Sequence, residues 1–332
     1  MSLPHPSARP EPPTPPTPGS PRPPALLGPR VLALLAITLW GLSFVATRVA
    51  LAEVAPVPLI AARLVLGTGF LLALLAARGE LSELAAVPKL PLAALGFLGI
   101  GFHLVLQAFA LRLTSAIHTG WLIGLIPIWS ALLAARFLGE RLTRVKVLGL
   151  ALGFGGALLV ITRGRLDATT LALPSARGDL LILLSTVNWA AYTIAGRSVM
   201  QRVRPRAATA FMIAVGLASV LPLALAGGGA AQVARASARA WAAIAFLGVG
   251  CSGLAYLLWS VALEKLSASR VAAFLYIEPL VTLAAAALYL HEPVGLTTVV
   301  GGLVVLAGVA LVQRPDASAA RAVDVAEGTG PA

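Results

Sequence analysis

Long apolar runs separated by short polar stretches fill most of this chain. Each run is near the length of about 20 residues that a helix needs to cross the hydrocarbon of a membrane. A spanning backbone must bond its own polar groups, so we predict an all-α integral membrane protein with ten transmembrane helices. The runs cover residues 31–51, 57–77, 90–111, 116–137, 145–162, 178–197, 207–226, 241–263, 269–290 and 295–313.

The two ends of the chain differ from these runs. Residues 1–30 hold half of the 24 prolines and little apolar surface, so we predict a disordered, Pro-rich cytoplasmic tail. No apolar core precedes Val31, which argues against a signal peptide. Residues 314–332 are polar and are predicted to form a second disordered cytoplasmic tail.

The apolar pattern occurs twice, which indicates an internal duplication. An offset of 152 places Ala110–Val160 on Ala262–Val312, and an offset of 149 places Phe97–Gly101 on Phe246–Gly250. The rarer residue types coincide in these alignments: Trp40 with Trp189, Arg48 with Arg197, Ser115 with Ser267, Pro127 with Pro279, Glu140 with Glu292, Gly149 with Gly301 and Gly156 with Gly308.

The two copies are residues 31–162 and 178–313, and each holds five predicted helices. Because five is an odd number, the second copy enters the membrane upside down relative to the first. Inverted repeats of this kind place a binding site near the membrane midplane, where the halves meet, and let it open alternately to each side. The predicted fold is therefore two inverted five-helix repeats.

Composition supports a membrane protein and excludes a soluble enzyme. Hydrophobic residues make up 58% and charged residues 11% of the 332 residues, and the mean hydropathy is +0.91. A soluble domain has about 45–50% apolar and about 25% charged residues. The net charge of +12 comes from scattered Lys and Arg, which indicates contact with lipid headgroups rather than nucleic acid. The lone Cys251 excludes a disulfide and a cysteine metal cluster, and no cofactor or metal is predicted.

The distribution of Lys and Arg predicts the orientation. With the N-terminus in the cytoplasm, the inner tails and loops carry 15 Lys and Arg residues and the outer loops carry 6. Cytoplasmic loops collect positive charge, so both termini are predicted to lie inside a plasma or inner membrane.

Several of the repeated residues resemble a known family. A Trp–x7–Arg pattern begins at Trp40 and again at Trp189, Leu111-x-x-x-Ser115-Ala116 lies between the third and fourth runs, and Gly-Glu-Arg-Leu-Thr covers Gly139–Thr143. These residues resemble the EamA-type repeats of the drug/metabolite transporter superfamily. The second copy departs from the pattern, with His-Glu-Pro in place of Gly-Glu-Arg around Glu292.

The resemblance implies a secondary transporter rather than an enzyme. Its expected substrates are small polar or amphipathic metabolites, often exported amino acids or related compounds. It also implies a central cavity lined by helices 1, 3, 4, 6, 8 and 9. A multidrug-type efflux carrier and an importer of the same fold remain open alternatives, as does the choice between a monomer and a homodimer.

Polar side chains recur at spacings of three and four on these same helices, so they share helix faces. Such stripes line a cavity or hydrogen-bond neighbouring helices together. The candidates for the substrate pathway are Trp40, Ser43 and Thr47 in helix 1, His103 and Gln107 in helix 3, Trp121 in helix 4, Ser185, Asn188 and Tyr192 in helix 6, and Ser252, Tyr256 and Trp259 in helix 8.

Glu278 is the only acid well inside a predicted helix, and its repeat-related residue is Ile126. A carboxyl at this depth is costly unless it faces a cavity or a partner. We therefore take Glu278 as the candidate for coupling transport to protons. The alternative is a structural carboxyl, hydrogen bonded in the gap that Pro279 leaves in the helix.

Two further pairs mark predicted hinges and helix ends. Pro127 and Pro279 interrupt helices 4 and 9, and Glu140 and Glu292 are predicted to cap the helix that follows each of them. Arg48 and Arg63, on helices 1 and 2, are expected to extend to the headgroups. A role for Arg48 in binding a substrate carboxylate is a second possibility. The repeated glycines are interpreted as close helix contacts.

Two rival classes are less well supported. An intramembrane enzyme would carry paired acids or metal ligands on its helices, and a passive channel would carry a ring of charged or carbonyl-rich filter sequence. The chain shows neither pattern.

The orientation can be tested with reporter fusions. A fusion at Gly164 should report the outer side, and one at Pro315 should report the cytoplasm, because an odd number of spans separates them. Reporters on living cells measure this directly. The same compartment at both positions would contradict the inverted arrangement.

Overall fold

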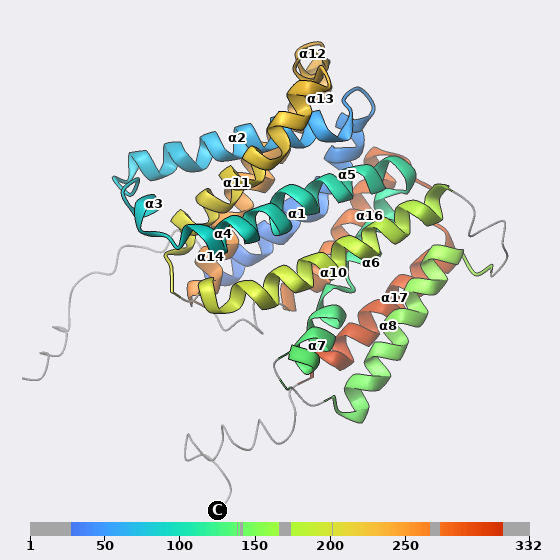
Figure 1. Cartoon of the computed structure of the whole chain (residues 1–332). Coiled ribbons are helices and arrows are strands. Elements are labelled where there is room, and N and C mark those ends of the chain that lie inside the picture. The colour runs from blue at the N-terminus through green and yellow to red at the C-terminus, as the bar shows by residue number, and fades with distance from the viewer. Residues whose placement is uncertain are drawn as a thin grey trace, which may run out of the picture.

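A computed structural model describes residues 28–137, 139, 142–165, 174–200, 202–265 and 273–314. In this part of the chain, eight helices are long and apolar enough to cross a membrane, and two shorter apolar helices cover Phe274–Tyr289 and Leu296–Val312. Together they account for the ten predicted helices (Figure 1). Glu140 and most of both tails lie outside the described residues.

The first repeat begins with two uninterrupted helices, and a proline in the first turn starts each of them. The later helices of this repeat are broken or shorter. Its elements are α1 (Pro29–Leu51), α2 (Pro56–Ala77), α3 (Glu83–Ala86), α4 (Lys89–Gly96), the π-helical η1 (Phe97–Phe102), α5 (His103–Leu113), α6 (Ala116–Ile123), α7 (Ile126–Phe137) and α8 (Arg144–Thr162).

The second repeat follows the same order. Its elements are α10 (Pro174–Met200), α11 (Pro205–Ala226), α12 (Gly229–Ala234), α13 (Ala238–Ala245), the π-helical η2 (Phe246–Ala255), α14 (Tyr256–Lys265), the 3₁₀ helix η3 (Ala273–Ile277), α16 (Glu278–Tyr289) and α17 (Leu296–Val312).

The third helix of each repeat contains a π-helical stretch at the same place in the duplication. The sequence Phe-Leu-Gly begins η1 at Phe97 and η2 at Phe246, and the offset of 149 relates these two residues. Glycines let neighbouring side chains pack directly against both stretches, because a side chain at Gly99 would collide with Tyr192 and one at Gly253 with Phe70. Such stretches are rare and often lie at functional sites.

The fourth helix of each repeat is broken near its middle. In the first repeat α6 ends at Ile123 and α7 begins at Ile126, and in the second η3 gives way to α16 at Glu278. Pro127 and Pro279 follow directly, and neither can donate the backbone bond that would continue a helix across the break. The predicted hinge positions therefore coincide with the observed breaks.

The two repeats are inverted. Helices α2 and α11 are repeat-related, yet the start of α11 lies beside the end of α2, where Arg206 Nε is 3.3 Å from Glu80 Oε2. Beyond the far end of α11, a side chain at Gly229 would meet Pro58 near the start of α2. The two helices are thus antiparallel (Figure 1).

Helices α8 and α17 form a symmetric antiparallel pair (Figure 1). A methyl group at Gly149 would lie 2.6 Å from the carbonyl oxygen of Gly308, and one at Gly156 would lie 2.6 Å from that of Gly301. The duplication exchanges these two contacts, so a pseudo-twofold axis passes between the helices. The backbones touch directly, as expected for small residues in lipid.

This contact predicts different effects for two neighbouring glycines. Gly156→Ala should destabilise the protein by about 1–3 kcal/mol, because the new methyl group meets backbone that cannot move aside. Gly155→Ala is the matched control, because a side chain there meets nothing within 4 Å. Thermal unfolding in detergent should show a lower midpoint for Gly156→Ala only. Equal midpoints for the two variants would contradict the close contact.

Candidate functional site

A chain of aromatic rings crosses the middle of the bundle and joins both repeats. The Trp40 ring of α1 lies 5.1 Å from Tyr256 and 5.4 Å from Trp259 in α14. Trp189 of α10 is 6.5 Å from Tyr256 and 5.1 Å from Tyr192. Each of these rings is partly exposed although it sits mid-helix and contacts another helix.

Two of the predicted polar residues bond the π-helical stretches across the repeats. Trp40 Nε1 donates to the carbonyl of Cys251 in η2 at 3.3 Å, and Asn188 Nδ2 donates to the carbonyl of Leu98 in η1 at 2.9 Å. The first helix of each repeat is thus tied to the third helix of the other. Asn188 was a candidate for the substrate pathway, with hydrogen bonding between helices as the alternative, and its amide here bonds the backbone of another helix.

His103 begins α5 directly after η1 and joins the aromatic chain. Its ring lies 4.8 Å from that of Trp189. The side chain is 5% exposed, and Nδ1 has no hydrogen-bond partner among the described residues. A buried nitrogen without a partner is uncommon and calls for an explanation.

Arg63 behaves differently from its prediction. It does not extend to the headgroups but is 5% exposed, and its Nε donates to Ser252 Oγ of η2 at 2.8 Å. Helices α2 and η2 approach closely, because a side chain at Gly67 would meet Ser252 and one at Gly248 would meet Leu66 and the Arg63 carbonyl. That contact encloses the arginine, and the sequence of α2 alone does not show it.

Glu278 lies where helix 9 breaks and is 6% exposed. It begins α16 rather than sitting within a continuous helix. The helices around it are close, because a side chain at Gly41 would meet Val281 and the Glu278 carbonyl, and one at Gly120 would meet Thr282. Thr282 Oγ1 lies 3.0 Å from both the Gly41 and the Glu278 carbonyl oxygens.

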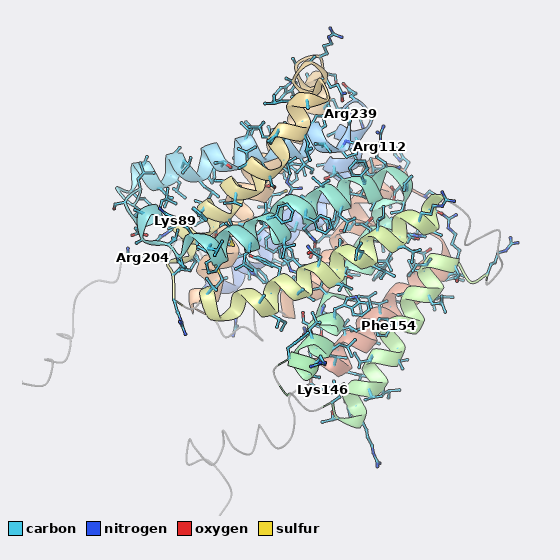
Figure 2. The ribbon with its side chains drawn as sticks, viewed as in Figure 1. Lys89, Arg112, Lys146, Phe154, Arg204 and Arg239 are labelled. Carbon is cyan, nitrogen blue, oxygen red and sulfur yellow. The ribbon has the colours of Figure 1, made fainter. Side chains whose placement is uncertain are left out.

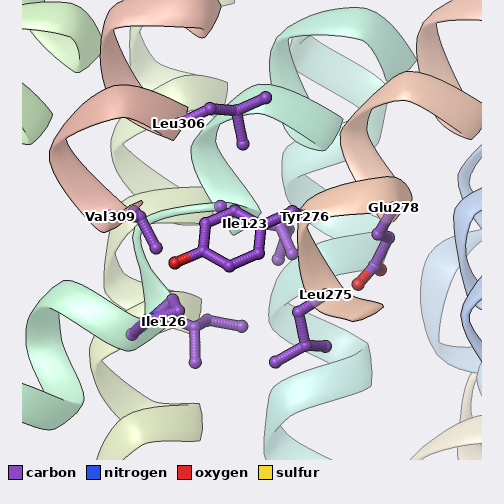
Figure 3. Close-up of a pocket in the computed structure, with 9 residues that line it drawn as sticks. Ile123, Ile126, Leu275, Tyr276, Glu278, Leu306 and Val309 are labelled. Carbon is purple, nitrogen blue, oxygen red and sulfur yellow. The ribbon is translucent and has the colours of Figure 1, made fainter. Parts of the chain in front are cut away.

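A small pocket of about 20 Å³ lies between the two broken helices and α17. Ile123 and Ile126 line it from one break, and Tyr276 and Glu278 from the other (Figure 3). The Tyr276 ring points toward Val309, while Glu278 lies on the other side of the same turn (Figure 3). This volume holds about one water molecule.

The other predicted pathway residues are buried between helices. Ser43, Thr47 and Gln107 are all less than a tenth exposed. Trp121 is 1% exposed and packs flat on Gly302 of α17, where any side chain would overlap its ring. In this conformation Trp121 therefore fills a helix contact and faces neither open space nor lipid.

Glu292 caps a helix, but not the helix that follows it. Its Oε1 and Oε2 accept hydrogen bonds from Ala116 N at 3.0 Å and Ile117 N at 3.1 Å, so it caps α6 of the other repeat. His291, with φ of 52°, turns the chain back after α16. This reversal directs the carboxylate across the repeat boundary, and α17, whose N-cap residue is Gly295, begins without a side-chain cap.

Arg48 reinforces the same turn between α5 and α6. Its Nη1 donates to the carbonyls of Leu111 at 2.7 Å and Thr114 at 3.3 Å, and its Nε lies 3.9 Å from Glu292 Oε1. Here Arg48 binds backbone, so its alternative role in holding a substrate carboxylate finds no support in this conformation.

Sequence reasoning missed a buried charged cluster beside this turn. Asp179 of α10 is fully buried, accepts a hydrogen bond from Thr114 Oγ1 and lies 2.9 Å from His118 Nδ1. Thr298 Oγ1 of α17 is 3.5 Å from His118 Nε2. Asp179 is the second residue of the predicted span 178–197 and therefore did not count as an acid well inside a helix, whereas α10 already begins at Pro174.

Acidic side chains join the loops at each end of the bundle. At the end that holds the α5–α6 turn, called the outer end after the predicted orientation, Glu53 accepts hydrogen bonds from Ser237 N at 2.7 Å and Ser237 Oγ at 2.6 Å. These bonds lower the pKa of Glu53 below its usual value. At the inner end, Glu83 pairs with Arg204.

The labelled charges follow this division. Lys89, Arg204 and Lys146 lie toward one end of the bundle, and Arg112 and Arg239 toward the other (Figure 2). Phe154 of α8 projects from the apolar span between them (Figure 2). Among the described residues, no group of His, Cys, Asp and Glu could hold a metal ion.

Comparison with known proteins agrees with this architecture. The EamA-like transporter family matches residues 29–162 and 176–314. A probable terminal-alkyne amino-acid exporter of Streptantibioticus cattleyicolor is 30% identical over 84% of this chain and 91% of its own length. A probable amino-acid metabolite efflux pump of Salmonella typhimurium is 28% identical over 83% and 92%.

A solved crystal structure shares the fold. It superposes with a TM-score of 0.61 at 20% identity and covers 89% of this chain and 98% of its own. The family matches cover both repeats, and the ten apolar helices account for a multi-pass membrane protein. The chain belongs to the EamA-like transporter family.

Proposed function

We propose that this transporter exports amino acids or related amphipathic metabolites by alternating access, with protonation of Glu278 coupled to the cycle. The observation that carries the proposal is the placement of the aromatic chain and Glu278 where the two inverted repeats meet. Aromatic faces suit apolar side chains and cations, and a carboxyl suits an ammonium group. Two relatives named for amino-acid substrates support the same substrate class.

The outer end explains how the site would be closed to that side. Glu292, Arg48 and Asp179 bring α1, α6, α10 and the α16–α17 connection together at one turn. Charge-assisted hydrogen bonds are stronger than neutral ones, so this turn holds the outer end shut. Opening requires α6 to leave Glu292, and the breaks at Ile126 and Glu278 let the outer halves of helices 4 and 9 move separately.

Proton coupling follows from the position of Glu278. Its carboxyl lies at the N-terminal end of α16, where the helix dipole favours negative charge, yet it is enclosed by packed helices. Water that enters when the site opens changes the balance between these two effects. The protonation state can therefore follow which side is open.

Transport assays would test the substrate class. Purified protein in liposomes with an imposed proton gradient should accumulate labelled L-phenylalanine against its own gradient. Tetraphenylphosphonium serves as the probe of a multidrug carrier. Accumulation of that cation without phenylalanine would replace the proposal with drug efflux, and equilibration of either compound without accumulation would indicate a passive channel.

Glu278→Gln should remove the pH dependence of this transport. The amide keeps the shape of the side chain but does not take up or release a proton near neutral pH. Uptake by the variant should no longer respond to the proton gradient, while binding of phenylalanine persists.

Glu53→Gln is the control for that experiment. Hydrogen bonds from Ser237 lower the Glu53 pKa below its usual value, so its carboxylate is ionised at neutral pH and does not follow the cycle. Its variant should keep the pH dependence of the wild type. An unchanged pH profile in Glu278→Gln would leave that residue a structural role only.

Glu292→Gln should open the outer end more often. The amide loses the negative charge that the α6 N-terminus and Arg48 bind. A cysteine at Thr47→Cys, in a Cys251→Ser background, reports access from outside to a membrane-impermeant maleimide. Labelling should rise several-fold with Glu292→Gln and stay unchanged with Glu80→Gln, which alters the inner end. Equal labelling in both would reject the outer closure.

A further inference from the structure

Arg63 is a buried cation without a matching anion. Within the described residues it forms no ion pair, and its Nε bond to Ser252 is its one hydrogen bond. Its two terminal nitrogens are not among the fully enclosed atoms that lack a partner, so each keeps some accessible surface although the residue is only 5% exposed. A charge held inside a membrane protein without a partner marks a place where a ligand or ion supplies the missing charge.

The surroundings of Arg63 point to the same place. The guanidinium is within electrostatic range of His103 and Tyr256. Both residues belong to the aromatic chain, because the His103 ring contacts Trp189 and the Tyr256 ring contacts Trp40. His103 presents the buried Nδ1 that has no partner. The terminal nitrogens of Arg63, from α2, and Nδ1 of His103, from α5, are thus polar atoms of one region without a protein partner, which indicates a site that accepts an acidic or hydrogen-bonding group.

We infer that Arg63, with His103 beside it, binds the carboxylate of a zwitterionic substrate. A guanidinium presents paired N–H donors that match the two oxygens of a carboxylate, and bonds of this kind are both strong and selective. The inference rests on the proposed export of amino acids and adds the charge pattern that the substrate must carry. It also adds α2 to the helices that line the site, which the resemblance did not include.

Glu278 supplies the opposite charge. Tyr256 is within electrostatic range of both Arg63 and Glu278, so the cation and the carboxyl belong to the same region of the bundle. An amino acid would place its carboxylate at Arg63 and its ammonium group toward Glu278, with its side chain against the aromatic rings. Binding of the ammonium group and binding of a proton at Glu278 would then compete, as exchange of substrate for protons requires.

The duplication argues against a purely structural arginine. The offset of 149 relates Arg63 to Met212, and His103 to Ser252. The Arg63–Ser252 contact therefore has Met212 and His103 as its counterpart, and Met212 Sδ accepts a hydrogen bond from Tyr192 instead. Because an apolar residue serves the equivalent helix contact, packing alone does not require a charge at Arg63.

Three probe compounds separate the two charges of the substrate. L-Phenylalanine carries both, its methyl ester lacks the carboxylate, and 3-phenylpropionate lacks the ammonium group. Calorimetric titration of the full-length protein in detergent should show phenylalanine binding about 10- to 100-fold more tightly than the ester, the range of a charge-assisted contact.

Arg63→Met tests the carboxylate contact with the residue that the other repeat uses. Arg63→Met should bind phenylalanine and its ester equally. Arg63→Lys should keep part of the preference for phenylalanine, and it replaces Arg63→Met in this test if that variant does not fold. Met212→Leu is the matched control and should keep the full preference. Glu278→Gln should keep the preference for acid over ester but lose that for phenylalanine over 3-phenylpropionate.

The outcomes distinguish this inference from the proposed function. If the wild type binds phenylalanine and the ester equally, or if Arg63→Met and Arg63→Lys both keep the full preference, the Arg63 site is wrong and amino-acid export stands. If the wild type binds none of the three compounds, the proposed substrate class fails and the Arg63 site fails with it.

Discussion

The absence of water in the hydrocarbon of a membrane is the constraint on which the rest of this structure depends. Each backbone group must find a partner inside the protein, so any interruption of a helix needs support from a neighbour. The chain interrupts its helices at repeat-related places, in η1 and η2 and at the breaks before α7 and α16. Trp40 and Asn188 donate to carbonyls of the π-helical stretches, and Thr282 donates near the break at Glu278. The irregular backbone is therefore gathered where the repeats meet.

The same constraint governs the charged side chains. At the outer end, Arg48, Glu292, Asp179 and His118 satisfy one another and the ends of helices, which makes that end a closed and internally bonded cluster. In the centre, the described residues offer Arg63 no such partner. The paired charges at the outer end hold helices together, whereas the unpaired Arg63 in the centre is the charge to which the proposed site assigns a ligand.

The duplication gives the two repeats a similar order of helices and breaks but different side chains. The pseudo-twofold symmetry relates the glycines at the contact between α8 and α17 to one another. It also relates Pro127 to Pro279 at the two helix breaks. The site departs from it: Glu278 stands opposite Ile126, and Arg63 opposite Met212. Symmetric packing permits two equivalent conformations, and in the proposed mechanism the asymmetric charges would let substrate and proton act on each conformation differently.

The sequence by itself determined the membrane fold, the duplication and its inversion, because run length, spacing and an odd helix count are properties of the chain in one dimension. It also located Pro127, Pro279 and Glu278, since a proline or an acid stands out in an apolar run. Only the tertiary structure decided that Glu292 caps α6, that Asp179 is buried, and that Arg63 turns inward to Ser252. Those outcomes depend on the rotation of each helix about its axis and on partners far away in sequence, and the packing of the ten helices sets both.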